Sequence, residues 1–256
     1  MHGRVCSRAM STSNQHLFIV TGASRGLGRA IAEQLLQPGH VVLGLSRQTP
    51  PAPAGLQQWA SDLAEPAPVA ARLQAWLEGL DGSQFASATL INNAAMLVDP
   101  KPLRDADANA LSAAVRIGLE APLLLSAAFL RATRDWSANK RVLHISSGLG
   151  RRAMAAQGPY CAVKAGLDHL ARAQALEEAE LDRGARVVAL APGIIDTDMQ
   201  LQLRGADPAG FPDHAAFVKM KSGGHLDSPA AAAAKVIAYL GRADFGSQPV
   251  GDVRDA

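Results

Sequence analysis

The sequence predicts a single-domain α/β fold with a doubly wound parallel sheet that helices cover on both faces. Short apolar runs of strand length alternate with longer helical stretches, and this alternation is typical of a parallel sheet. The 256 residues are 48% hydrophobic, which suffices for one large buried core, and no linker divides them. The strand-like runs lie near 16–21, 40–46, 57–61, 87–93, 140–147 and 184–191.

The segments between these runs have the length and composition of helices. Ser228-Pro229 provides an N-cap and a first-turn proline for the last of them. Residues 198–227 are polar and interrupted by Gly and Pro, which predicts a mobile substrate lid, with an ordinary surface loop as the alternative. Helices are expected at about 26–37, 66–79, 106–134, 158–181 and 229–241.

The N-terminal residues 1–15 lack an apolar core of signal-peptide length and are expected to form a disordered tail before the domain at 16–256. Met10 is a second candidate for the natural start. No other run looks long enough to cross a bilayer, so no membrane partner is expected. Only Cys6 and Cys161 are present, which argues against a disulfide framework and favours a reducing cytoplasm. Cys161 is interpreted as a small packing residue.

The charge of the chain is mild. The net charge of +2 and the pI of about 8.7 come from scattered rather than clustered side chains. Proteins that bind nucleic acid present a concentrated basic surface. No nucleic-acid partner is therefore expected, and a small molecule is the favoured ligand.

The first strand leads into a glycine-rich turn and then an amphipathic helix, which is the order of a dinucleotide site. Glycines let the backbone approach a pyrophosphate, and the positive end of the helix dipole meets its charge. A phosphate-binding P-loop is excluded because no Gly-Lys-Ser/Thr follows. The sequence thus predicts a Rossmann fold whose first cofactor-binding residues are Gly22, Ser24, Arg25, Gly26, Leu27 and Gly28.

The residues after the second strand indicate which dinucleotide binds. Sites for NAD usually place a carboxylate there to hold the ribose diol, whereas Ser46-Arg47 follows Leu45 here. Ser46 and Arg47 can donate to a 2′-phosphate, and Arg25 can approach it from the glycine-rich turn. NADP(H) is therefore the predicted cofactor. Solvated surface arginines are the alternative interpretation.

Three side chains in the second half of the chain form a proton-donor pattern. On a helix Tyr160 and Lys164 share one face, and Ser147 lies upstream at the end of a strand-like run. At an effective dielectric near 20 and ~5 Å, the ammonium lowers the phenol pKa by about two units, or roughly 3 kcal/mol. Tyr160 is then expected to exchange protons near neutrality. Ser147 is preferred to Ser146 because only one of two consecutive strand residues faces the cleft.

With these motifs the chain resembles the short-chain dehydrogenase/reductase family over nearly its whole length. The thirteen-residue step from Ser147 to Tyr160 is the family's usual one, and Ala95 replaces the usual glycine of an Asn-Asn-Ala-Gly strand end. The resemblance implies that Ser147, Tyr160 and Lys164 are catalytic and that no metal is required. It implies further cofactor contacts at Asp62, Leu63, Asn93, Ala94, Ala95, Tyr160, Lys164, Pro192, Gly193, Ile195 and Thr197.

One position departs from the family pattern. The fourth catalytic residue is usually an Asn in the long helix, and counting back from Pro122 places Gly118 there. In relatives the Asn supports a helix distortion whose carbonyl holds a relay water beside the lysine. Glycine can permit the same distortion. Proton relay is therefore expected to survive, and a Gly118→Asn change is expected to alter kcat only modestly.

The loop from Pro192 to Gln200 resembles that of the sepiapterin reductase and benzil reductase branch, which implies a dicarbonyl or α-hydroxy-ketone substrate. Asp196 alternatively only caps the helix that follows. Arg151 and Arg152 near the pocket mouth are interpreted as solvated side chains rather than anion binders. The predicted apolar lining comprises Leu97, Leu149, Met154, Ile194 and Met199, each of which is equally compatible with ordinary core.

The function that follows is NADP(H)-dependent reduction of a ketone, diketone or α-hydroxy-ketone by hydride transfer, with Tyr160 as proton donor. Two alternatives stay open: a non-catalytic NADP(H)-binding regulator or redox sensor, and an alcohol dehydrogenase working oxidatively. The apolar helices at 106–134 and 158–181 favour association, and the family resemblance implies a homodimer or homotetramer.

Overall fold

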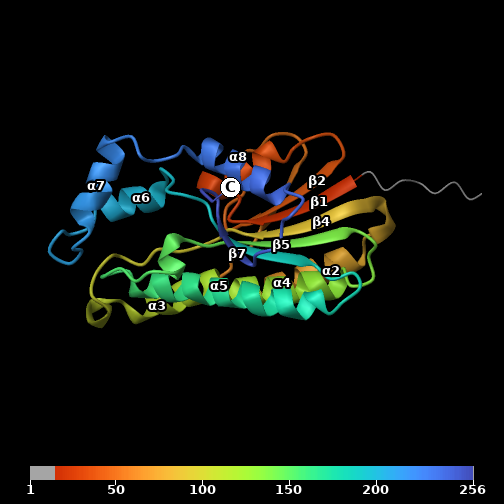
Figure 1. Ribbon diagram of the computed structural model, residues 1–256, viewed down its shortest axis with the longest axis horizontal. Coiled ribbons are helices and arrows are strands. Elements are labelled where there is room, and N and C mark those ends of the chain that lie inside the picture. The colour runs from red at the N-terminus through yellow and green to blue at the C-terminus, as the bar shows by residue number, and fades with distance from the viewer. Residues whose placement is uncertain (1–14, 256) are drawn as a thin grey trace, which may run out of the picture.

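The computed structural model describes residues 15–255 as one parallel sheet of seven strands between two layers of helices (Figure 1). The strand order is β3-β2-β1-β4-β5-β6-β7, so the direction of winding reverses between β1 and β4. This confirms the predicted single-domain, doubly wound α/β fold. The strands are β1 (Gln15–Thr21), β2 (His40–Ser46), β3 (Leu56–Ala60), β4 (Phe85–Asn92), β5 (Asn139–Ile145), β6 (Arg186–Ala191) and β7 (Val250–Asp252).

Helices cover each face of the sheet because alternate strand residues point to opposite faces. Leu17 and Ile19 face one layer of helices, and Phe18 and Val20 face the other. The first layer contains α2 (Pro66–Glu78), α4 (Ala121–Ala132) and α5 (Gly158–Ala179); the second contains α1 (Gly26–Gln34) and α8 (Pro229–Leu240) (Figure 1). Two apolar cores result, one on either side of the sheet.

The predicted helix at 106–134 is observed as three joined segments. These are α3 (Ala108–Val115), a π-helical turn at Arg116–Glu120 and α4. By length and composition, the continuous stretch Ala108–Ala132 could cross a membrane, which corrects the expectation that no run was long enough. In this fold α4 packs against α2 and β4, and α3 against α5, so the stretch belongs to the helical layer of the domain.

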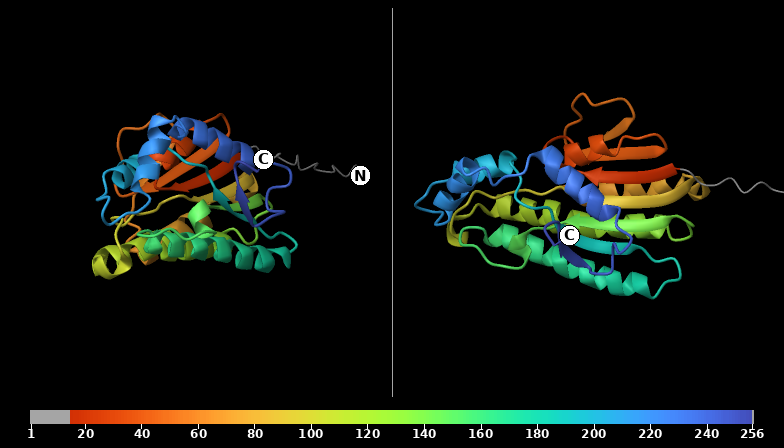
Figure 2. Two further views of the ribbon diagram at one scale, coloured as in Figure 1. Left: turned by 60° about the vertical axis from the view of Figure 1, so that its left-hand side comes forward. Right: turned by 45° about the horizontal axis from the view of Figure 1, so that its top comes forward.

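Residues 198–227, predicted as a substrate lid or an ordinary surface loop and here called the lid, contain two helices, of which only the first was considered in the sequence analysis. They are α6 (Asp198–Arg204) and α7 (His214–Ser222), and both extend beyond one end of the sheet (Figures 1 and 2). Ile195 forms an isolated parallel bridge with Asp227, which closes the base of the lid. The short strand β7 was also not predicted, because three residues are too few to form a recognisable apolar run.

The N-terminal prediction needs one change. Gln15, assigned to the tail, is the first residue of β1, so the domain includes it. Residues 1–14, the rest of the predicted tail including Met10, lie outside the described residues, as does residue 256.

The carboxyl ends of the parallel strands meet at one edge of the sheet, and the lid extends from this same edge (Figure 2). Open α/β sheets bind ligands at this edge, close to the point where the winding reverses. The fold therefore places the residues that follow β1, β2, β4, β5 and β6 around a common space.

Candidate active site

A cavity of about 1130 Å³ opens at the carboxyl edge of the sheet and brings the predicted site residues together. Its walls come from the strand ends, the start of α5 and the lid. The predicted residues that line it are Gly22, Ser24, Arg25, Gly26, Leu27, Gly28, Ser46, Arg47, Asp62, Leu63, Asn93, Ala94, Ala95, Ser147, Tyr160, Lys164, Pro192, Gly193, Ile195 and Thr197.

The glycine-rich turn between β1 and α1 has a geometry that only glycine allows. Gly22 and Gly26 adopt φ values of 70° and 56°. A Cβ at Gly28 would lie 2.3 Å from the carbonyl oxygen of Gly22. The backbone segments at Gly22 and Gly28 are thus in close contact, which leaves no room for side chains. The backbone N–H groups at the N-terminus of α1 face the cavity, where they can bind an anionic phosphate.

Thr21 joins the glycine-rich turn to the end of β4. Its hydroxyl accepts hydrogen bonds from the backbone N–H groups of Asn93 and Ala94, each at 2.9 Å. The side chain of Asn93 donates in return to the carbonyl of Thr21 at 2.9 Å. Sequence analysis assigned Thr21 no role, because these partners lie more than seventy residues away.

Ser46 and Arg47, at the end of β2, form a part of the cavity wall that carries a positive charge and no carboxylate. The Ser46 hydroxyl donates to the carbonyl of Gln48 at 2.7 Å, and Arg47 is exposed. Within residues 15–255 no ion pair uses Arg47. Its guanidinium is therefore available to an anionic ligand.

Arg25 does not join this wall. Its Nη1 lies 2.6 Å from Oδ2 of Asp198, the first residue of α6, and both side chains are largely exposed at 72% and 62%. Arg25 nevertheless lines the same cavity as Ser46 and Arg47, and its approach to a ribose phosphate stays a prediction. Its ion pair connects the glycine-rich turn to the lid.

The residues predicted to be catalytic, Ser147, Tyr160 and Lys164, are brought together by β5 and α5. Tyr160 lies in the first turn of α5, and Lys164 follows one turn later with 2% of its surface exposed. The Lys164 ammonium donates to the carbonyl of Ile145 at 2.6 Å and lies 5.5 Å from the centroid of the Tyr160 ring. Ser147 follows β5, and its hydroxyl accepts from the N–H of Leu149 at 3.2 Å.

Burial, rather than the ammonium, controls the proton affinity of Tyr160. The protein atoms around the phenol raise its pKa to about 12, although the hydroxyl of Ser147 lowers it in part. Burial also lowers the pKa of Lys164 to about 8, and the nearby Asp168 carboxylate opposes that change. Lys164 makes no contribution to this pKa, because its ammonium is directed at the carbonyl of Ile145. The acidification of Tyr160 by Lys164 stays a prediction.

A buried carboxylate supports Lys164 from the next turn of α5. Asp168 is 2% exposed; it accepts a hydrogen bond from the Ser146 hydroxyl and pairs with Arg151, whose Nε lies 3.3 Å from Oδ2. Arg151 also donates to the carbonyl of Gly251 in β7 at 2.8 Å. Arg151 is therefore a structural link rather than a solvated side chain, and Ser146 is occupied elsewhere, which leaves Ser147 to face the cavity.

A second buried polar network lies beneath the trio. The ring of His144 is hydrogen-bonded to Asn92 at 3.2 Å and to Gln174 at 2.9 Å. Complete burial lowers the pKa of His144 to about 4, so the ring is neutral at physiological pH. This network joins β4, β5 and α5 and has no access to the cavity.

Gly118 lies inside the π-helical turn, where the helix distortion was expected. A Cβ at this position would lie 2.5 Å from Cγ1 of Val163, which is itself buried. The distortion is thus present without the asparagine side chain, and Val163 fills the adjacent space. The expectation that Gly118→Asn alters kcat only modestly is not supported, because an asparagine would displace Val163 next to Lys164.

The lid contributes a separate apolar cluster to the cavity. Leu97, Leu203, Phe211 and Phe217 form its buried part. The predicted lining residues Leu97, Leu149, Met154, Ile194 and Met199 all face the cavity. The residues Gln157, Gln202, Leu203, Phe217, Met220 and Arg254 line it as well and were not predicted. The two lid helices were hard to predict because their few apolar residues lie in a polar stretch that is interrupted by Gly and Pro. Such a stretch shows little hydrophobic periodicity.

Asp196 does not cap α6. Its carboxylate lies between Arg204, at 3.4 Å, and Lys221, so it connects α6 to α7. These two cations lower the pKa of Asp196. Asp196 therefore holds the two lid helices together, which was not among the sequence-based interpretations.

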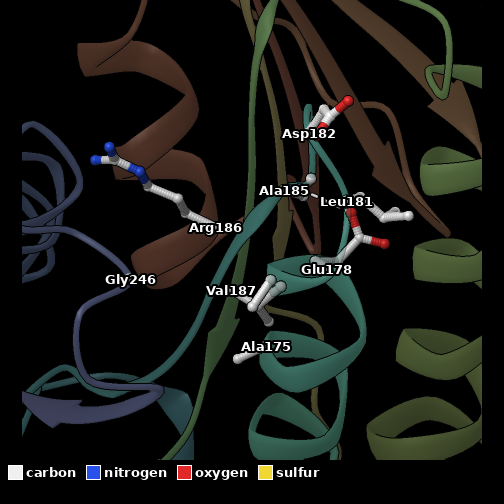
Figure 3. A pocket seen from close by; sticks show the side chains of 10 residues that line it. Ala175, Glu178, Leu181, Asp182, Ala185, Arg186, Val187 and Gly246 are labelled. Atoms are coloured by element: carbon white, nitrogen blue, oxygen red, sulfur yellow. Dashed lines mark hydrogen bonds between the residues drawn. The ribbon is translucent and has the colours of Figure 1, made fainter.

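A smaller hollow of about 260 Å³ lies at the opposite end of β6 (Figure 3). Its polar side chains have structural partners: Glu178 accepts from the N–H of Ala185 at 2.7 Å, and Arg186 donates to the carbonyl of Ala243 at 3.0 Å. Figure 3 shows Arg186 and Glu178 pointing in different directions. Residues 15–255 contain no cluster of three His, Cys, Asp or Glu side chains that could hold a metal.

Comparison with known proteins gives a consistent result. A family model described as short chain dehydrogenase matches residues 16–207. The benzil reductase ((S)-benzoin forming) of Bacillus cereus is 33% identical over 243 residues, covering 92% of this chain and 96% of that protein. The sepiapterin reductase of Mus musculus is 33% identical, covering 90% and 93%. A crystal structure of a short-chain dehydrogenase/reductase from Burkholderia vietnamiensis is 35% identical, with a TM-score of 0.63 and coverage of 95% and 99%.

Proposed function

We propose that this chain, which belongs to the short-chain dehydrogenase family, is an NADP(H)-dependent reductase of bulky dicarbonyl compounds. The family membership makes it an oxidoreductase that uses a nicotinamide cofactor. The observation that carries the proposal is the meeting of Ser147, Tyr160 and Lys164 with the glycine-rich turn in one cavity. A binding module without catalytic activity has little need of such a proton donor.

The residues of the cavity divide the work of a carbonyl reduction. Reduced nicotinamide supplies a hydride when bound. Ser147 donates a hydrogen bond to the substrate oxygen, and Tyr160 gives that oxygen its proton. A phenol whose pKa lies near 12 keeps its proton until the oxygen becomes strongly basic. Lys164 holds the strand end at Ile145 and places a positive charge behind the phenol.

The preference for NADP(H) rests on the wall after β2. No carboxylate stands there to repel a 2′-phosphate, and Arg47 is exposed with no ion-pair partner in the described part of the chain. Ser46, at the end of β2, lines the cavity beside it, with its hydroxyl donating to the carbonyl of Gln48. The positive charge of Arg47 therefore attracts the 2′-phosphate of NADP(H). The ribose diol of NAD(H), in contrast, has no carboxylate here to bind it.

The substrate class follows from the apolar lining and from the relatives. Met154, Met199 and Met220 surround the cavity together with Phe217, and flexible methionine side chains adapt to bulky apolar groups. Two relatives are named after dicarbonyl or pterin substrates, benzil and sepiapterin. A diketone with apolar substituents is thus the favoured substrate, with an α-hydroxy-ketone as product.

The exposed surface of two helices bears on how the enzyme assembles. Leu123 on α4 and Leu176 on α5 are exposed at 43% and 73%, which favours burial of these helices in a homodimer or homotetramer. A cytoplasmic location suits an enzyme that draws on NADPH and carries few cysteines.

The test measures NADPH oxidation with benzil and a panel of diketones and aldehydes. We expect kcat/KM with NADPH to exceed the NADH value at least tenfold, and comparable values would contradict the cofactor preference. Tyr160→Phe should lower kcat by roughly 10²–10⁴-fold, since general acid catalysis contributes about that much. Tyr239→Phe, which alters the one other tyrosine, is the matched control. NADPH binding without turnover on any carbonyl would favour a regulator instead.

A further inference from the structure

The side-chain amide of Gln157 lies at the substrate half of the cavity with an unused nitrogen. Gln157 is 2% exposed and lines the cavity, and its Nε2 has no hydrogen-bond partner within residues 15–255. Leaving a buried amide unpaired costs about 1–3 kcal/mol, and such groups are rare in folded proteins. An unpaired amide in a cavity wall therefore points to a group on the ligand.

The position of Gln157 relates this amide directly to the proton donor. Gln157 is the N-cap residue of α5, Tyr160 lies three residues later in its first turn, and both side chains line the cavity. Gln157 makes no side-chain capping hydrogen bond. Its amide therefore has no structural task that would explain its burial beside Tyr160.

The backbone before Gln157 is strained. Ala156 has a φ of 61°, and it is the one non-glycine residue with a positive φ among residues 15–255. Such conformations persist where the surroundings require them, often at ligand sites. Met154, Ala156 and Tyr160 pack together on the apolar cluster of the lid. The segment that carries Gln157 is thus part of the wall that a substrate contacts.

The amide has the freedom to present a donor. Its Nε2 is enclosed, and a half-turn of the terminal amide exchanges it with Oε1, an atom of nearly the same size. The N–H group can therefore turn to a ligand without any change in the backbone.

We propose that Gln157 donates a hydrogen bond to the second oxygen of a dicarbonyl substrate, while Ser147 and Tyr160 hold the carbonyl that is reduced. This rests on the proposed function and names the group that selects its substrate. Gln157 and Tyr160 line the cavity from the start of α5, so their polar ends can reach two oxygens on adjacent carbons. A monoketone lacks the second oxygen and leaves the amide unpaired.

The experiment compares two probes with Gln157→Met, which keeps the length of the side chain and removes the donor. Benzil has two adjacent carbonyls, and in deoxybenzoin a methylene replaces one of them. We expect kcat/KM of the variant to fall at least tenfold on benzil and less than threefold on deoxybenzoin, because only benzil loses a partner. Gln157→Glu, which also lacks the amide donor, should give the same selective loss and decides the matter if Gln157→Met fails to fold.

The matched control is Gln202→Met. Gln202 also lines the cavity, but its amide already donates to the carbonyl of Leu97 at 3.4 Å and to Asp99 at 2.9 Å. Any effect of this change should be equal on the two probes. Equal losses on both probes in the Gln157 variants, or no loss, would overturn the role of Gln157 while wild-type turnover upholds the proposed function. A wild-type enzyme that reduces neither diketones nor ketones would overturn both.

Discussion

The two walls of the cavity are held in place by different forces. On the wall formed by the glycine-rich turn and the start of α5, contacts are buried and specific. The hydroxyl of Thr21, at the end of β1, holds the backbone that follows β4, and the carboxylate of Asp168 lies beneath Lys164. On the lid, a small apolar cluster of Leu97, Leu203, Phe211 and Phe217 is joined by ion pairs at or near the surface, including Arg25 with Asp198 and Lys221 with Asp196. We expect the first wall to keep one arrangement and the lid to open more easily.

This difference matches the tasks of the two walls. Proton transfer and cofactor binding need atoms fixed to within fractions of an ångström, which close packing provides. A bulky substrate must enter and leave, and solvent-exposed ion pairs contribute little enough to open at small cost. The predictions that follow test whether the two walls differ in this way.

The largest difference is expected between two glycines with the same backbone conformation. Gly22 in the turn and Gly224 in the lid both have φ of 70°, but a Cβ at Gly22 would lie 2.9 Å from Asn93 Nδ2 and 3.1 Å from Ala94 Cα, whereas nothing lies within 4 Å at Gly224. Gly224→Ala should cost only the strain of the left-handed conformation, about 1–2 kcal/mol. Gly22→Ala should cost several kcal/mol, because overpacking adds roughly 1–3 kcal/mol.

Urea unfolding measures the loss of stability in each variant, and NADPH titration measures the loss of cofactor affinity. Gly22→Ala should weaken NADPH binding at least a hundredfold and Gly224→Ala less than threefold. Similar losses in the two variants would show that the turn is no more constrained than the lid.

An intermediate effect is expected from Asp168→Asn. The Asp168 carboxylate raises the pKa of Lys164, which burial has lowered to about 8, so its removal should lower that pKa further. Lys164 then loses its proton at lower pH, and the fall in kcat/KM on the alkaline side should begin about one pH unit earlier, equivalent to roughly 1.4 kcal/mol. Arg151 and Ser146 keep a polar partner in the asparagine.

The pH profile separates this electrostatic role from a merely structural one. At pH 6, where the ammonium is present in both proteins, the variant should approach the wild-type rate. Asp182→Asn, which alters a carboxylate just beyond α5, is the control and should leave the profile in place. A uniform loss at every pH would contradict a role through Lys164.

The smallest effect is expected from Asp198→Asn, which breaks the ion pair between the glycine-rich turn and the lid. Both partners are largely exposed, and such pairs contribute little. KM for NADPH should change by less than about fivefold, and the change should disappear in concentrated salt, which screens exposed charges. A larger loss that persists in salt would place this pair with the buried contacts.

Sequence patterns were sufficient for the features that depend on neighbours along the chain. The alternation of strand and helix follows from local hydrophobic periodicity, and the Tyr160–Lys164 spacing places both side chains on α5 in any helix. The glycine-rich turn follows β1 directly, so its conformation also depends on a few adjacent residues. For this reason the parallel sheet and the residues around its carboxyl edge are predictable from the sequence.

Other features depend on residues far apart in sequence. Arg25 meets Asp198 across 173 positions, and the space beside Gly118 belongs to Val163 on another helix. The lid helices α6 and α7 are stabilised by Phe211, Phe217 and Leu97, which the polar composition of the segment conceals.

The amino-acid sequence by itself determined the fold class, the order of the elements and the placing of Tyr160 and Lys164 on one helix, because these follow from periodicity and spacing. Tertiary structure alone decided that Tyr160 lies partly buried against the lid, that Asp168 lies beneath Lys164 and that Nε2 of Gln157 is buried without a partner among residues 15–255. The physical reason is that burial and partner geometry set proton affinity and hydrogen bonding, and both are properties of the packed chain.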